Sequence, residues 1–165
     1  MYCQGRLAVQ NFAPDEVLYR RCSAGEIDLE TGLPDSSAFT FPRMSVNRGA
    51  FSEPGDCRYP ANHHDYVVAF TVGDIPTPLQ AENRGNTIHF RPFHEPITRD
   101  DDSTRDFENY GHTEIRAYRT AACADVDEVK KSSKLPDSVK LKFRQMLADR
   151  CRIVCEPRPD LNPNQ

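Results

Sequence analysis

The chain has 165 residues, 38% of them hydrophobic and 28% charged, and its formal net charge is −4. This length corresponds to a single domain, because domains usually span roughly 100–200 residues. The negative charge excludes a general electrostatic attraction to nucleic acid. Residues 1–6 lack the basic-then-apolar pattern of a signal peptide, and no apolar run approaches the ~20 residues of a membrane span. We therefore expect a cytoplasmic protein with no membrane association.

Three early segments have the pattern of β-strands. Residues 16–22 form an apolar and aromatic run that ends in two adjacent arginines, only one of which can face a given side of a sheet. In residues 41–48, Met44 and Val46 alternate with Ser45 and Asn47, which is typical of a strand with one core face and one polar face. Residues 66–72 are almost continuously apolar, so we expect a strand buried on both faces at the centre of the sheet.

The second half of the chain predicts two more strands, a helix and a short final strand. We expect a strand over 86–92 that ends at Pro92, and another over 110–119. The latter carries charge on both faces, which indicates an edge strand or the lining of a cleft. From Pro136 to about residue 150, the apolar residues recur at helical spacing, and residues 152–155 favour a last short strand.

These elements predict an α+β fold. We expect a single domain over residues 1–156, with a mainly antiparallel or mixed β-sheet and one C-terminal amphipathic helix packed on it. Residues 157–165 contain three prolines and no apolar periodicity, so we expect a flexible tail.

Six cysteines are scattered along the chain without a CxxC pair. In the cytosol they would be reduced thiols, because that compartment keeps thiols reduced. Structural zinc needs about four converging Cys and His ligands, usually in two close pairs, and this spacing does not offer them. We therefore expect no metal site and no cofactor.

The candidate site residues are polar groups at strand ends or on strand faces. No motif for nucleotide phosphates, a serine hydrolase or a metalloprotease occurs. Arginine presents a rigid fork that fits phosphate or carboxylate, and histidine can shuttle protons near neutral pH, so the residue types point to an anionic ligand. The predicted catalytic residues are His112, Glu114 and Arg20, and the predicted ligand-binding residues are Arg21, Ser45, Asn47, Arg48, His94 and Tyr110.

A structural interpretation of the same residues stays open. Ser45 and Asn47 are residue types that also hold turns and backbone through hydrogen bonds. An arginine at a strand edge is often paired with a carboxylate such as Glu114, and a single histidine such as His112 is often a hydrogen-bonded structural residue.

The chain resembles a group of small uncharacterised bacterial proteins with an Arg-Arg strand, an Ala-Phe element and a Ser-Val-Asn-Arg core. The segments that carry this resemblance are Leu18-Tyr19-Arg20-Arg21, Ser37-Ala38-Phe39, Met44-Ser45-Val46-Asn47-Arg48 and Tyr110-Gly111-His112-Thr113-Glu114. It covers residues 16–120 and implies a bacterial, cytoplasmic setting. The order of an Arg on the first strand, then Ser, then Glu is also similar to the layout of ADP-ribosyltransferase-like folds, although no Ser-Thr-Ser or Glu-x-Glu motif accompanies it.

Three hypotheses of function follow. The first is a bacterial intracellular binding or accessory protein that recognises an anionic small molecule, a nucleotide or a partner protein through the face from Ser45 to Arg48. The second is a nucleotide-dependent transferase or nucleic-acid-processing enzyme that uses Arg20, His112 and Glu114. The third is an antitoxin-like or complex subunit with no pocket. A concave cluster of polar groups would favour the first two, and a flat apolar patch the third.

Overall fold

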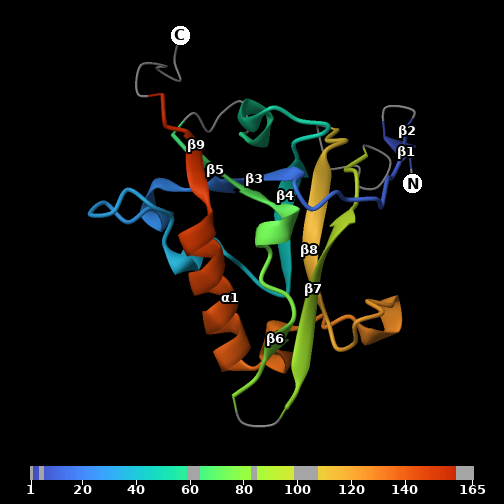
Figure 1. Ribbon diagram of the computed structural model, residues 1–165. Coiled ribbons are helices and arrows are strands. Elements are labelled where there is room, and N and C mark those ends of the chain that lie inside the picture. The colour runs from blue at the N-terminus through green and yellow to red at the C-terminus, as the bar shows by residue number, and fades with distance from the viewer. Residues whose placement is uncertain (1, 4–5, 59–63, 83–84, 99–107, 159–165) are drawn as a thin grey trace.

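A seven-stranded sheet organises the computed structural model of the protein, which describes residues 2–3, 6–58, 64–82, 85–98 and 108–158. The strand order is β6-β7-β8-β4-β3-β5-β9, and each pair of neighbouring strands is antiparallel. The helix α1 packs on one face of the curled sheet (Figure 1). The protein is thus a single small α+β domain, which confirms the predicted fold class.

The elements have the following bounds. The strands of the large sheet are β3 (Val17–Cys22), β4 (Arg43–Arg48), β5 (Tyr66–Thr71), β6 (Leu79–Gln80), β7 (Thr87–His94), β8 (His112–Tyr118) and β9 (Arg152–Cys155), and α1 is Asp137–Arg150. A separate two-stranded sheet joins β1 (Tyr2–Cys3) to β2 (Arg6–Leu7). Short 3₁₀ helices occupy several loops, including one at Pro54–Cys57.

The helix forms where the sequence predicts it. Asp137 lies in its first turn directly after Pro136, and Val139, Phe143 and Leu147 are its buried residues, four positions apart. This spacing places them on one stripe. The ring of Phe143 lies 4.4 Å from that of Phe90 on β7, centroid to centroid. The aromatic contact fixes α1 against the sheet.

Strand β5 is buried as predicted but does not lie at the centre of the sheet. It pairs with β3 on one side and β9 on the other, and β4 is the middle strand. Val68 and Phe70 of β5 belong to the core cluster that contains the residues of α1. Val67 and Ala69 point to the opposite face and are also fully buried, and the 3₁₀ helix Pro54–Cys57 contacts β5. A strand near the edge of a sheet can therefore be buried on both faces when a loop covers the second one.

Strand β7 runs through Pro92 and ends at His94, two residues beyond the predicted end. Proline is tolerated in a strand where its missing N–H would face an unpaired edge. The outer neighbour of β7 is β6, which pairs only with Thr87 and Ile88. Among the described residues, Pro92 therefore lies on a part of β7 that has no outer strand to bond with.

The five cysteines whose side chains the structure describes are free thiols. Burial raises the pKa of Cys22 to about 11, and those of Cys57 and Cys151 to about 12. These thiols therefore stay protonated and unreactive at neutral pH. Within the described ranges no group of three or more His, Cys, Asp and Glu side chains could hold a metal ion, and no helix is long and apolar enough to cross a membrane.

Candidate functional site

The predicted site residues lie on two different faces of the sheet. Along β4, Ser45 and Asn47 point to one face, while Met44, Val46 and Arg48 point to the other. The second face is covered by α1 and by the N-terminal segment. We call the first face, away from α1, the polar face, and it consists of Arg43, Ser45 and Asn47 on β4, His112, Glu114 and Arg116 on β8, Arg91 and Phe93 on β7, and Glu95 directly after β7.

The binding hypothesis assumed that Arg48 shares a face with Ser45 and Asn47. The structure places Arg48 on the opposite face. It is 3% exposed and forms a two-pronged ion pair with Glu16, with Nε–Oε1 at 2.5 Å. It also donates to the carbonyl oxygens of Val9 and Asn11, at 2.6 and 2.8 Å. The guanidinium lies 4.0 Å above the ring of Phe12. Four of its five N–H donors hold the N-terminal segment.

His94 binds the same segment and is fully buried. Its Nε2–H donates to the carbonyl oxygen of Tyr110 at 2.5 Å, and its Nδ1 accepts from the backbone N–H of Val9 at 2.8 Å. A carbonyl can only accept and an N–H can only donate, so the ring is the neutral Nε2–H tautomer. Burial lowers the pKa of His94.

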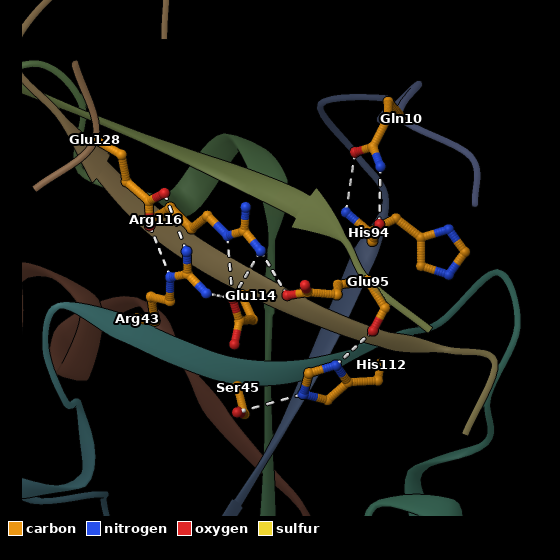
Figure 2. Close-up of polar contacts among 9 residues, drawn as sticks. All are labelled: Gln10, Arg43, Ser45, His94, Glu95, His112, Glu114, Arg116 and Glu128. Carbon is orange, nitrogen blue, oxygen red and sulfur yellow. Dashed lines mark hydrogen bonds and ion pairs between the residues drawn. The ribbon is translucent and has the colours of Figure 1, made fainter. Parts of the chain in front are cut away.

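Two further contacts complete this arrangement. The hydroxyl of Tyr110 donates to the carbonyl oxygen of Leu7 at 2.8 Å. The side-chain amide of Gln10 accepts from the backbone N–H of His94 at 3.0 Å and donates to its carbonyl oxygen at 2.8 Å (Figure 2). Gln10 thereby caps the free edge of β7. We call Arg48, His94 and Tyr110 the N-terminal clamp, because all three hold residues 7–16.

Three arginines cross the polar face in one row. Arg91 is the cross-strand partner of Arg116, and Arg116 is the partner of Arg43. We call these three residues the arginine row. Like charges directly opposite one another destabilise a sheet, so the row requires compensation. None of the three was among the predicted site residues, because the row depends on the register between strands that are far apart in the sequence.

Carboxylates compensate two of the three arginines. Arg116, which is 5% exposed, pairs with Glu95 and Glu114 and stacks at 4.0 Å over the ring of Phe93. Arg43 reaches Glu114 at 3.3 Å and forms a two-pronged pair with Glu128, with Nε–Oε1 at 2.7 Å (Figure 2). Arg91 is exposed, and the described part of the chain gives its side chain no hydrogen bond or ion pair.

The two carboxyls between these arginines differ in acidity. Burial raises the pKa of Glu114, and the hydrogen bond to Glu95 and the charge of Glu95 raise it further. Burial also pushes the pKa of Glu95 upward, but the hydrogen bond from Glu114 and the charge of Arg116 outweigh that effect, so the pKa of Glu95 is lowered. As the pH falls, Glu114 is therefore protonated before Glu95. The protonated carboxyl of Glu114 is the donor in its hydrogen bond to the Glu95 carboxylate.

A histidine and a serine lie next to this cluster. The Nδ1–H of His112 donates to the carbonyl oxygen of Glu95 at 2.7 Å. Its Nε2 lies 3.4 Å from the Oγ of Ser45, across the gap between β8 and β4 (Figure 2). Of the predicted residues, the structure brings Ser45, Asn47, His112 and Glu114 together on the polar face. Their predicted roles remain hypotheses.

Arg20 and Arg21 lie outside this group, and Asn47 within it is buried. Arg20 points to the opposite face from Tyr19 and donates to the carbonyl oxygens of Ala38 and Ser45, at 2.6 and 2.8 Å. Arg21 pairs with Asp65 at 3.5 Å. Asn47, 5% exposed, accepts a hydrogen bond from Asn109, while its own Nδ2 has no partner among the described residues.

No protein-family model, no curated protein and no solved structure matches this chain. The functional argument therefore rests on the geometry of the polar face.

Proposed function

We propose that this protein binds an anionic group, a phosphate or a carboxylate, on its polar face through the arginine row. The observation that supports the proposal is the position of Arg91, Arg116 and Arg43 directly opposite one another on three adjacent strands. Such a row costs stability in the absence of counter-charges. An anion bound across it would relieve this repulsion, and guanidinium forks match phosphate and carboxylate oxygens.

The members of the row have different parts in this proposal. Arg91 is exposed, so a ligand can reach its guanidinium from solvent. The side chain of Arg43 is 37% exposed and can exchange its looser partner, Glu114 at 3.3 Å, for a ligand oxygen. Arg116 is held in place by Glu95, Glu114 and Phe93, and it contributes a fixed positive charge between Arg91 and Arg43.

Protonation of Glu114 should strengthen anion binding. The charged groups that surround it are Glu95, Arg43 and Arg116, with Glu128 beyond Arg43. Because the pKa of Glu114 is raised, it becomes neutral at a higher pH than an ordinary carboxyl. Its neutralisation leaves three arginines facing two carboxylates and releases Arg43 from one partner. We therefore expect anion affinity to rise as the pH falls through the pKa of Glu114.

A thermal melt tests the proposal. Wild-type protein is unfolded with inorganic phosphate, pyrophosphate, citrate, mono- and dinucleotides and short RNA at constant ionic strength. A ligand that binds only the folded state adds about 2.7 kcal/mol of stability at 100 times its Kd. We expect at least one anion to raise the Tm, and Arg91→Gln to reduce that rise. Arg152→Gln is the matched control, because Arg152 is an exposed arginine on β9.

Sulfate tests the linkage to Glu114, since its charge does not change over this pH range. We expect sulfate to bind wild type more tightly at lower pH, and Glu114→Gln to bind with much less dependence on pH. An equal Tm rise in wild type and Arg91→Gln with every anion, or no rise with any of them, would contradict the proposed function.

The transferase hypothesis gains no support from this geometry. It uses Arg20, His112 and Glu114, but the guanidinium of Arg20 donates to the backbone carbonyl oxygens of Ala38 and Ser45. A nucleotide remains one of the anions in the panel above.

We also propose that the protein works in a bacterial cytoplasm. The free thiols among the described residues support a reducing compartment. All six thiols should react with an alkylating reagent after denaturation without reductant, and a blocked pair would contradict this setting.

A further inference from the structure

We infer that Ser45 is an activated nucleophile and that His112 is its general base, which gives the polar face a second capacity: acyl transfer from small oxygen esters. This activity does not depend on an anion at the arginine row. It rests on three atoms in sequence, the Oγ of Ser45, the Nε2 of His112 and the carbonyl oxygen of Glu95.

The tautomer of His112 is set by its backbone partner. The carbonyl oxygen of Glu95 only accepts, so at 2.7 Å it must receive the Nδ1–H. The neutral ring then carries its lone pair on Nε2, the atom that lies 3.4 Å from the Oγ of Ser45. A nucleophile within reach of a base, with the base oriented by a third group, is the arrangement that activates serine.

Strand register explains why this geometry is maintained. Ser45 is the cross-strand partner of Glu114, and Asn47 is that of His112. The imidazole therefore leans diagonally from β8 to β4 to reach Ser45, while Glu95 follows the end of β7, which is paired to β8 on its other side. The base and its orienting group come from rigid strands or their ends, which favours a preorganised pair.

Access from solvent favours small substrates. Ser45 is exposed, and His112 is half-buried. A carbonyl carbon can thus approach the Oγ directly from the open side of the sheet. The charged side chains of the polar face are Glu95, Glu114, Arg43, Arg91 and Arg116.

The chemical step balances without a further reactant other than water. The Oγ of Ser45 attacks the ester carbon and forms a new C–O bond, while its proton passes to Nε2 of His112. The bond to the leaving alkoxide breaks, and the imidazolium returns the proton to that oxygen. Water, deprotonated by the same Nε2, then releases the acid and restores Ser45.

Two neutral probes test this inference: a fluorophosphonate with an uncharged alkyl chain, and para-nitrophenyl acetate. The fluorophosphonate should form a P–O bond to Ser45 with loss of fluoride, and mass spectrometry of the digested protein locates the adduct. A general base contributes typically about 10²–10⁴-fold, so we expect His112→Gln to lose at least about 100-fold in labelling rate. Ser45→Ala should lose the adduct and the release of para-nitrophenol.

Matched controls separate this role from a structural one. Ser37 is an exposed serine on another segment, and His89 lies on β7 beside the same face, so Ser37→Ala and His89→Gln should label at the wild-type rate. In wild type, the labelling rate should rise with pH through one ionisation, because only the neutral ring accepts the proton. A rate without that step, an adduct absent from Ser45, or equal labelling in folded His112→Gln would overturn the inference. Because the probes are neutral, such a failure would leave the anion site untouched.

Discussion

The N-terminal clamp and the polar face both rely on arginine and histidine, yet they use them differently. In the clamp, Arg48 is 3% exposed and makes four hydrogen bonds, two to Glu16 and two to backbone carbonyls. On the polar face, Arg91 is exposed and has no such bond among the described residues. The difference teaches that residue type alone does not mark a site. Burial and the number of donors already used decide whether an arginine serves the fold or remains available to a ligand.

Removing the clamp arginine should have the largest effect on stability. Arg48→Met keeps most of the side-chain length but leaves Glu16, 11% exposed, without its partner. Breaking a buried ion pair on one side costs about 3–5 kcal/mol. We expect the free energy of unfolding, measured in urea, to fall by about that amount. Adding Glu16→Gln should recover part of the loss, and a wild-type unfolding midpoint for Arg48→Met would refute the clamp.

The clamp histidine should make stability depend on pH. The pKa of His94 is lowered by burial, so the folded state keeps the ring neutral where the unfolded chain, with a pKa near 6.5, takes up a proton. Stability should therefore be full above that value and fall as the pH drops toward the pKa of the folded state, by up to about 1.4 kcal/mol per pH unit for one proton.

The variants His94→Gln and His89→Gln isolate this effect. The glutamine at position 94 cannot titrate, so the difference between its pH profile of stability and that of wild type should show the loss below about pH 6.5. His89→Gln, a change outside the clamp, should retain the wild-type profile. Parallel profiles for wild type and His94→Gln would mean that the ring is not held neutral.

The cap on β7 should have a smaller effect. Gln10→Ala removes two hydrogen bonds to the backbone of His94, each worth about 0.5–1.5 kcal/mol. Gln10 is exposed and water can replace part of the lost hydrogen bonding, so we expect a total loss of about 1 kcal/mol. Hydrogen exchange of the His94 amide should accelerate in this variant. Unchanged exchange would show that the N-terminal segment does not protect the edge.

The polar face should tolerate substitution best. Arg91→Gln changes an exposed side chain that has no hydrogen bond or ion pair among the described residues, so we expect a change in unfolding free energy within about 0.5 kcal/mol. The same variant should lose anion affinity, which is the reverse of the pattern at Arg48. Urea denaturation checks the first expectation, and a loss of several kcal/mol would show that Arg91 belongs to the fold instead.

Local patterns predicted the elements more successfully than they predicted the site. The buried stripe of Val139, Phe143 and Leu147 marked α1, because helical spacing is a local property of the sequence. Strand alternation, applied strictly to β4, would also have separated Arg48 from Ser45. The arginine row could not be predicted, because the pairings of Arg91 with Arg116 and of Arg116 with Arg43 depend on the register of β7, β8 and β4. The sequence predicted a strand end at Pro92, but β7 continues to His94. Proline is tolerated there because that part of β7 is an open edge, and the sequence does not show which part of a strand lies at an edge.

A nuclear magnetic resonance titration with pyrophosphate tests the central claim most directly. Backbone amides and arginine Nε–H groups are followed as the ligand is added at constant ionic strength and pH. The account predicts saturable shifts on β7, β8 and β4, strongest at Arg43 and Arg91, with Arg48 and residues 7–16 unchanged. Shifts centred on Arg48 and the N-terminal segment, or no saturable shift at the arginine row, would contradict it.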